Sequence, residues 1–475
     1  MSLNENQNVE CIGNSIHEFV NEFLNSYLNM PNNMVVKEMD PDRFDFVKNI
    51  GIPKEGRAVK EVVHELVKDV YPYGHNSGHP RYFGFVPSNS SLLSWLGDIL
   101  TTAYNRHAGS YANFPAGNNI ENQVIQWLCH KAGYNDQAGG LFVSGGSMAN
   151  MSALTIARDK ILTEDTWHLG VAYVSSQTHS SVAKGLRIIG IGKARIRVVP
   201  VNENFELDVK ELKRMIEEDK QAGLLPFTVI ASAGTTNTGS IDPLKEIAEV
   251  CKQYHLWMHV DGAFGASVLL SNTYKHLLSG IELADSISWD AHKWLFQTYG
   301  CGMVLVKDKT DMLNSFHVNP EYLKDLERDD DCINPFDLGI ELTRPARGLK
   351  LWLTLQVLGS NVVSDAIDHG FYLAKLVQSE LEKLDDIEIV SPACLAMINF
   401  RFNPAHLNEA QKDELNLQIS KRIIDSGYAG IFTTVLKGKK VLRICAINPE
   451  TTKEDICNTI QHLNDYYKEL VNTYQ

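Results

Sequence analysis

The sequence has few of the features that mark membrane or secreted proteins. No apolar run approaches the roughly 20 residues that a membrane span needs, and the first residues, MSLNENQNVE, lack the basic and apolar pattern of a signal peptide. The eight cysteines are scattered, with no close pair at metal-ligand or redox-motif spacing. We therefore expect free thiols, no metal site and a cytoplasmic location.

Positive charge is also scarce. Aspartate and glutamate number 58 against 44 lysines and arginines, which gives a formal net charge of -14. Such a chain repels nucleic acid and anionic membranes, so neither is expected as a partner. The 475 residues, 44% of them hydrophobic, are enough for a large core and for about two to four domains.

An amphipathic helix is predicted near the N-terminus. Apolar residues from Ile16 to Leu28 follow the helical period behind a capping box of Ser15 and Glu18, and Pro31 ends the pattern. A short leading helix with a wide apolar face has little core of its own, so it should pack on another domain or on a second subunit. A homodimer is the expected assembly.

Between residues 120 and 306, short apolar runs alternate with amphipathic segments of ten or more residues. The predicted strands are LFVS, GVAYVSS, IRVVPV, FTVIASA and LWMHVD, each separated from the next by a predicted helix. This alternation predicts an α/β fold with a mainly parallel sheet that helices cover on both faces. Ligands of such sheets bind at the carboxyl ends of the strands.

The pattern changes after a long predicted helix that begins near Gly348. Short strands (IEIVSP and AMINFRF), a helix, a hairpin around Lys437 and Gly438, and a final helix behind Thr452 and Asp455 describe a smaller α+β domain. We expect three parts: an N-terminal helical dimerisation segment (1–91), a large ligand-binding domain (92–347) and a small C-terminal domain (348–475).

Lys293 lies just after a probable strand, in DSISWDAHKWLFQ, among apolar and aromatic neighbours. Burial favours the neutral amine, which makes a lysine a good nucleophile for a Schiff base. The segment is equally compatible with a lysine that packs its stem beside a tryptophan and keeps its ammonium in water. His292 beside it could as well be a core histidine.

Asp261 ends the predicted strand LWMHVD and precedes the small residues GAFGAS, so its carboxylate should lie at the carboxyl edge of the sheet. An acid there can pair with a protonated ring nitrogen of a cofactor, which then acts as an electron sink. The alternative is a carboxylate that caps the following turn.

The segment LFVSGGSMAN reads as a strand, a glycine turn and the start of a helix. Backbone amides at such a turn bind phosphate, and a small phosphate cofactor fits better than a nucleotide because the P-loop lysine and the full dinucleotide fingerprint are missing. A tight turn without a ligand would look the same. His179, in SSQTHSSVAKG, also lies between a strand and a helix and could stack on a planar ring, although an isolated histidine is more often structural.

Seven motifs in order, SGGSMAN, THSSVAKG, AGTTNTGS, HVDGAFGAS, DSISWDAHKW, HVNPEYL and LTRPARGLKLW, resemble those of the group II pyridoxal-phosphate decarboxylases. Members of that family act on aromatic amino acids, glutamate and histidine. The run ADSISWDAHKWLFQTYG is similar to bacterial tryptophan and aromatic amino-acid decarboxylases. The resemblance extends from about Tyr71 onward and implies the aspartate-aminotransferase-like fold (fold type I), with a seven-stranded type of sheet and an obligate dimer that shares its active sites.

By position, the resemblance implies that Lys293 forms the Schiff base with pyridoxal 5'-phosphate, Asp261 pairs with the pyridine nitrogen and His179 stacks on the ring. It makes Tyr322, on a charged stretch suited to a mobile loop, the donor of a proton to Cα after carbon dioxide leaves. Thr343 would reach in from the other subunit. The implied cofactor-binding residues are Gly146, Ser147, Met148, His179, Thr236, Asp261, Ala263, Asp290, His292, Lys293 and Thr343.

The stretch HPRYFGFVPS resembles the family's substrate side. The implied substrate-binding residues are Phe85, Val86, Pro87, Ser88, His107 and Phe336. Such a wall suits an aromatic side chain, whereas glutamate would need a cationic or multi-donor site that these stretches lack. The resemblance to bacterial tryptophan enzymes implies tryptophan as the substrate. Those enzymes carry tryptophan where Phe336 stands, so the preference for indole could be altered, and phenylalanine and tyrosine remain alternatives.

Several positions depart from the animal aromatic decarboxylases. Asp290 replaces an asparagine, Gly262 and Phe264 replace alanine and tyrosine, and no proline precedes His292. These changes bear on the substrate more than on the cofactor. Glutamate decarboxylation, transamination, the oxygen-consuming, aldehyde-forming reaction and a non-catalytic homodimeric binding module are the competing hypotheses. The retained His179 and Tyr322 favour plain decarboxylation.

Overall fold

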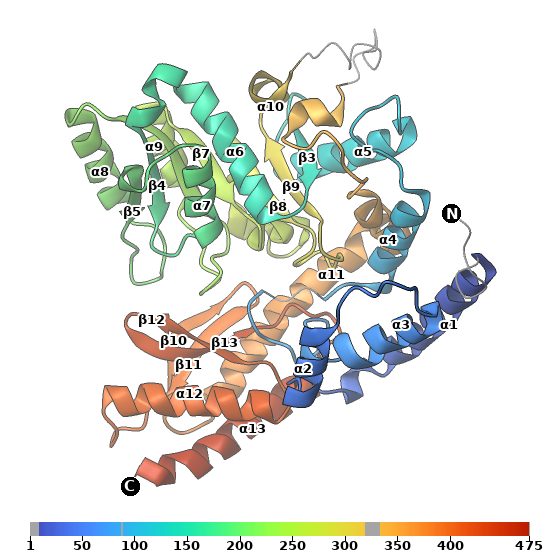
Figure 1. The fold of residues 1–475 in the computed structure, drawn as a ribbon. Helices are drawn as coiled ribbons and strands as arrows, with labels where there is room; N and C mark the ends of the chain where they lie inside the picture. The colour runs from blue at the N-terminus through green and yellow to red at the C-terminus, as the bar shows by residue number, and fades with distance from the viewer. Residues whose placement is uncertain (1–8, 87–88, 319–332, 475) are drawn as a thin grey trace.

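A seven-stranded sheet forms the centre of the larger part of the molecule in the computed structural model, which describes residues 9–86, 89–318 and 333–474 (Figure 1). Its strand order is β3–β9–β8–β7–β6–β4–β5. Strand β9 runs antiparallel to both neighbours, and the other pairs are parallel. The predicted, mainly parallel α/β sheet is confirmed. The strands are β3 (Gly139–Val143), β4 (Gly170–Ser175), β5 (Ile196–Val199), β6 (Leu225–Ser232), β7 (Trp257–Asp261), β8 (Ser286–Asp290) and β9 (Gly302–Val306).

Helices cover both faces of this sheet because alternate side chains of each strand point to opposite sides. In β4, Ala172 and Val174 pack with residues of α6 and α7, while Val171 and Tyr173 pack in the larger core with residues of α5, α8 and α9. Strands that are buried on both faces read as continuous apolar runs. The helices of this part are α5 (Pro115–Lys131), α6 (Gly146–Ile161), α7 (Ser180–Ile188), α8 (Val209–Gln221), α9 (Leu244–Tyr254) and α10 (Lys309–Phe316).

A four-stranded antiparallel sheet of order β10–β11–β13–β12 forms the smaller part, with α12 and α13 packed against it (Figure 1). The predicted hairpin is confirmed: Lys437 and Gly438 both have positive φ, as a tight turn between β12 and β13 requires. Thr452 and Asp455 form the capping box of the last helix. The elements are β10 (Ile387–Cys394), β11 (Met397–Phe402), α12 (Glu409–Asp425), β12 (Phe432–Leu436), β13 (Lys439–Cys445) and α13 (Lys453–Val471).

The N-terminal helix is longer than predicted. Helix α1 (Val9–Leu28) already includes Ser15, so the predicted capping box of Ser15 and Glu18 is wrong. Val9 and Ile12 continue the apolar period towards the N-terminus, and Glu18 instead forms an ion pair with Lys60, Nζ to Oε2 3.0 Å. The elements that follow are β1 (Val36–Lys37), α2 (Pro41–Asn49), α3 (Val59–Glu65), β2 (Gly74–His75) and α4 (Leu92–Tyr104).

Helix α11 (Leu349–Leu381) links the two larger parts of the molecule (Figure 1). It is kinked at Gly359, whose φ of 75° lies in the region that favours glycine. Within residues 9–86, 89–318 and 333–474, every helix is too short or too polar to cross a membrane. The division at residues 91 and 347 stays a prediction.

Candidate active site

Six strands of the large sheet run in one direction, and the segments after the carboxyl ends of five of them, β3, β4, β6, β7 and β8, enclose a cavity of about 440 Å³. A cavity at this edge agrees with the general rule for parallel sheets. The predicted cofactor-binding residues, except Thr343, all line it, so residues up to 147 positions apart in the chain are neighbours in space. They are Gly146, Ser147, Met148, His179, Thr236, Asp261, Ala263, Asp290, His292 and Lys293.

The glycine turn between β3 and α6 lies against the residues that follow β8. A Cβ at Gly145 would be 2.9 Å from His292 Cε1, and one at Gly146 would be 2.9 Å from Asp290 Oδ2, so larger residues would not fit without a shift. No side chain caps the start of α6. The first amide groups of this 16-residue helix are therefore available to an anionic group in the cavity.

Three donors hold the buried carboxylate of Asp261. Oδ1 accepts hydrogen bonds from Ala263 N at 3.1 Å and Ser288 Oγ at 3.2 Å, and Oδ2 accepts one from Asn150 Nδ2 at 3.0 Å. These donors hold the carboxylate of Asp261 at the cavity wall, where it can accept a further hydrogen bond from a ligand. A protonated ring nitrogen would donate such a bond.

Lys293 follows β8 in a turn, with Nζ 3.1 Å from Asp290 Oδ2. Burial lowers the pKa of His292, so its ring is neutral near pH 7. Asp290 Oδ1 and His292 Nδ1 are buried and have no hydrogen-bond partner among the described residues. Buried polar atoms are normally paired, so these two indicate a place for a polar ligand beside the glycine turn.

His179 is the N-cap residue of α7. Its Nδ1 accepts a hydrogen bond from Ser181 N at 3.2 Å and lies 2.8 Å from Ser181 Oγ. These contacts occupy one ring nitrogen and fix the ring at the cavity wall. An aromatic ring held there can stack on a planar ligand.

The predicted substrate residues that the structure describes, Phe85, Val86, His107 and Phe336, do not line this cavity in a single chain. Phe85 has a positive φ and stacks on Phe432, with ring centroids 5.2 Å apart. His107 Nδ1 accepts a hydrogen bond from Gly109 N at 3.0 Å, and Phe336 is buried. The partly buried Val86 packs against the main core, and Thr343 is exposed. Pro87, Ser88 and Tyr322 lie outside the described residues. All these assignments stay predictions.

Several residues around the cavity were not predicted from the sequence. Asn150 and Ser288 hold Asp261, and Arg443, a buried residue of β13, donates a hydrogen bond to Thr236 O. Burial lowers the pKa of Arg443. The alternation of serine with apolar residues in SISWD was a usable signal for Ser288, since it places every second side chain on one face. Nothing in the sequence pointed to Arg443.

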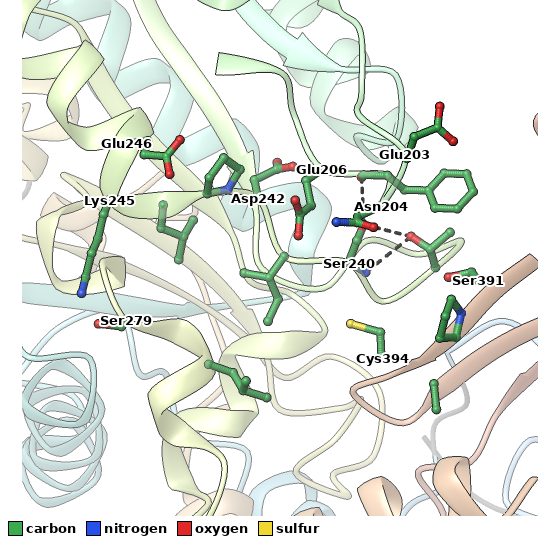
Figure 2. A pocket seen from close by; sticks show the side chains of 18 of the residues that line it. Glu203, Asn204, Glu206, Ser240, Asp242, Lys245, Glu246, Ser279, Ser391 and Cys394 are labelled. Carbon is green, nitrogen blue, oxygen red and sulfur yellow. Dashed lines mark hydrogen bonds between the residues drawn. The ribbon is translucent and has the colours of Figure 1, made fainter. Parts of the chain in front are cut away.

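A second pocket, of about 610 Å³, lies between loops of the large part and strand β10 (Figure 2). Asp242 is buried at its wall, where its carboxylate accepts hydrogen bonds from Leu207 N and Ser232 N, both at 2.7 Å. Burial, with a contribution from nearby Glu206, raises the pKa of Asp242 to about 6. No predicted site residue lines this pocket.

Comparison with known proteins identifies the family. Residues 41–403 match the pyridoxal-dependent decarboxylase conserved domain, so the chain belongs to the pyridoxal-dependent decarboxylases. This confirms the resemblance to the group II enzymes and their fold, and the cofactor is pyridoxal 5'-phosphate. The described residues fit that cofactor: the open amides at the glycine turn suit its phosphate, and Asp261 suits its ring nitrogen.

Three known proteins illustrate the range within the family. An aromatic-L-amino-acid decarboxylase of Bacillus atrophaeus is 39% identical over 425 residues, which are 89% of this chain and 88% of the relative. An L-2,4-diaminobutyrate decarboxylase of Acinetobacter baumannii is 30% identical, with 86% and 84% covered. Oryza sativa TDC, solved with PLP and tryptamine, superposes with a TM-score of 0.92 at 26% identity and covers 98% of this chain and 99% of its own.

Proposed function

We propose that the protein decarboxylates an aromatic L-amino acid, tryptophan first, with phenylalanine and tyrosine as alternatives, to the arylalkylamine and carbon dioxide. One observation carries the proposal: apart from Lys293, neither the described residues that line the cavity nor the predicted substrate residues Phe85, Val86, His107 and Phe336 include a lysine or an arginine. A substrate with a distal carboxylate would need a cation besides Lys293. The similarity to an aromatic-L-amino-acid decarboxylase agrees with this choice.

In this proposal the residues of the cavity have distinct roles. When bound, the cofactor supplies an electron sink for the electrons left at Cα as the carboxylate departs. Lys293 would attach the cofactor through Nζ, and Asp261 would keep the ring nitrogen protonated by accepting a hydrogen bond from its N–H. The amides of Gly146 and Ser147 bind the phosphate, and the neutral His292 assists them.

Two further residues control the proton and the geometry. His179, held at Nδ1 by Ser181, would stack on the cofactor ring. Tyr322 gives a proton to Cα after carbon dioxide leaves, as a general acid.

The active site is proposed to be shared between the subunits of a homodimer. Apolar side chains are exposed in the single chain on α1 (Ile16), α4 (Leu100 and Tyr104) and α11 (Val357 and Val362). Such exposure is common at protein interfaces. His107 and Phe336, which lie outside the cavity of their own chain, would then complete the partner's substrate side, and Thr343 would reach the partner's cofactor.

A cytoplasmic location is part of the same proposal. Cys129, Cys251, Cys301 and Cys445 are buried thiols, and burial raises the pKa of Cys129 to about 12. Unpaired thiols of this kind persist in reducing compartments. Secretion into the medium with formation of disulfides would contradict this assignment.

Three other reactions compete on the same cofactor: glutamate decarboxylation, diaminobutyrate decarboxylation, and aldehyde formation with oxygen. The test is a screen of the purified protein against L-tryptophan, L-phenylalanine, L-tyrosine, L-glutamate and L-2,4-diaminobutyrate, with amine, aldehyde, peroxide and carbon dioxide all quantified. We expect tryptamine, phenylethylamine or tyramine in equal amount to carbon dioxide. Preference for glutamate or diaminobutyrate overturns the substrate, and aldehyde with peroxide overturns the reaction.

A further inference from the structure

Three side chains on one face of β7 lead from the interior of the sheet to the cavity. Trp257, His259 and Asp261 alternate along the strand, so they share a face, and all three are buried. The parallel register places Ser286 of β8 beside His259 and Ser288 beside Asp261. Helix α6 packs over both strands on this side.

A continuous chain of hydrogen bonds connects these residues. Trp257 Nε1 donates to Ser286 Oγ at 2.8 Å, and Ser286 Oγ lies 2.9 Å from His259 Nδ1. His259 Nε2 lies 2.9 Å from Asn150 Oδ1, and Asn150 Nδ2 donates to Asp261 Oδ2 at 3.0 Å. Only the last member, Asp261, and Asn150 line the cavity.

The donors of this chain can point in one direction only. The indole of Trp257 has a donor and no acceptor, and an ionised carboxylate only accepts. Asn150 must therefore turn its amide nitrogen to Asp261 and its oxygen to His259, whose Nε2 then carries the hydrogen. Burial lowers the pKa of His259 to about 4, against the opposing effect of Asp261, so the ring is neutral and carries one hydrogen. Its Nδ1 accepts from Ser286.

We propose that Trp257, Ser286 and His259 are positioning residues that fix the amide of Asn150 and thereby keep Asp261 an acceptor aimed at the cofactor ring nitrogen. The proposal rests on the role that the proposed function gives to Asp261. It does not depend on the substrate. Because every member is buried, an incorrect orientation cannot be corrected by water, and a change at Ser286 should be felt at the cavity.

Loss of the Ser286 hydroxyl removes the donor that satisfies His259 Nδ1. His259 could then carry its hydrogen on Nδ1, and Asn150 could reverse its amide and direct an oxygen at the carboxylate of Asp261. Two acceptors that face each other repel, so the carboxylate would lose its hydrogen bond from Asn150 and move from the position in which it accepts a hydrogen bond from the ring nitrogen. The charged or titratable groups that face Asp261 across the cavity are His179, Asp290, His292 and Lys293, and none of them changes in this variant.

The test compares Ser286→Ala with Ser267→Ala in the holoenzyme. Ser267 is a matched control, because it is equally buried and accepts a hydrogen bond from an indole, Trp289 Nε1, at 3.0 Å, but it does not lie on the chain to Asp261. The readouts are the pH midpoint of the cofactor's visible-violet absorbance, the dissociation constant of pyridoxal 5'-phosphate from equilibrium dialysis, and Tm. Trp257→Phe, which removes the indole donor and keeps an aromatic ring, serves as a second variant if Ser286→Ala does not fold.

We expect Ser286→Ala to move the pH midpoint by at least about half a unit and to weaken cofactor binding several-fold, with Trp257→Phe smaller in the same direction. Ser267→Ala should lower Tm comparably but leave the midpoint unchanged. The proposal is wrong if Ser286→Ala and Trp257→Phe keep the wild-type midpoint. It is also wrong if Ser267→Ala shifts the midpoint as much as Ser286→Ala does. Asp261→Asn distinguishes failure of this proposal from failure of the proposed function. If Asp261→Asn also leaves the midpoint unchanged, the role of Asp261 in the proposed function is wrong. If Asp261→Asn shifts the midpoint but Ser286→Ala and Trp257→Phe do not, only the positioning role of Trp257, Ser286 and His259 is wrong.

Discussion

The cofactor side and the substrate side of the site are built in different ways. On the cofactor side, Asp261 ends β7 and Lys293 follows β8, and backbone hydrogen bonds fix the register of these strands. Both side chains lie in the cavity of a single chain. On the substrate side, Phe85, His107 and Phe336 lie in connecting segments outside that cavity. A sheet edge thus positions the chemistry common to a fold, while connecting segments determine what is bound.

The cofactor side can be disrupted most completely at Lys293. Lys293→Ala should abolish the visible-violet absorbance of the protein, its bleaching by borohydride and all decarboxylation, because no other lysine among the described residues lines the cavity. Lys307→Ala is the control, since Lys307 is exposed just after β9, at the opposite edge of the sheet. A reducible chromophore that survives in Lys293→Ala would show that the attachment is elsewhere.

Asp261→Asn should keep the cofactor bound and lower kcat by roughly 10² to 10³-fold, the loss typical when one preorganised electrostatic partner of a reacting group is removed. An amide cannot stabilise a protonated ring nitrogen as a carboxylate does. Asp285→Asn is the matched control, because Asp285 accepts a hydrogen bond from Met258 N at 2.7 Å at the other end of the same strands. Similar kcat values in the two variants would contradict the pairing.

Tyr322→Phe tests whether Tyr322, a residue assigned to neither side alone, donates the proton to Cα. It removes one acidic hydroxyl, and a general acid contributes typically 10² to 10⁴-fold to the step that it serves. We expect the variant to release carbon dioxide but to form less amine, and to divert the carbanion towards oxygen with aldehyde, ammonia and peroxide as products. Product yields per carbon dioxide, in air and under nitrogen, are the measurement. Unchanged amine yield and rate would make His179 the candidate donor.

A smaller effect is expected on the substrate side, at Phe336. Phe336→Trp should raise the ratio of kcat/KM for tryptophan over phenylalanine by about 2- to 10-fold, since an aromatic pair contributes about 0.5 to 1.5 kcal/mol beyond burial. Phe44→Trp is the control, because Phe44 is exposed on α2. If both variants keep the wild-type ratio, Phe336 does not face the substrate.

The cofactor side could be predicted from the sequence more fully than the substrate side. Strands, helices and the cofactor residues follow from local periodicity and from the rule that parallel strands end at one edge. The start of α1 was misplaced because Ser15 fits a helix interior as well as a cap. Asn150 and Arg443 escaped prediction because their contacts with Asp261 and Thr236 join segments more than 100 residues apart, and no local pattern encodes such contacts.

The least effect on catalysis is expected at Asp242, in the second pocket (Figure 2). Its pKa is raised from 3.8 to about 6, so between these values the folded protein binds more protons than the unfolded chain. Asp242 therefore stabilises the fold below about pH 4, and this contribution is lost as the pH rises through 6. At 1.36 kcal/mol per pKa unit, the loss is up to about 3 kcal/mol.

Asp242→Asn cannot ionise, and its amide oxygen can accept only one of the two backbone hydrogen bonds cleanly. The variant should be less stable than the wild type at pH 4, and the deficit in the free energy of unfolding should shrink by up to about 3 kcal/mol by pH 7. Urea denaturation at several pH values measures both proteins. The measured quantity is the difference between the two proteins in the free energy of unfolding. Burial lowers the pKa of His79 to about 4, so His79 changes the stability with pH in the opposite direction, and this contribution is the same in both proteins and cancels in the difference. A difference that is constant with pH, or a changed kcat at pH 7, would show that the second pocket is not independent of the cofactor side.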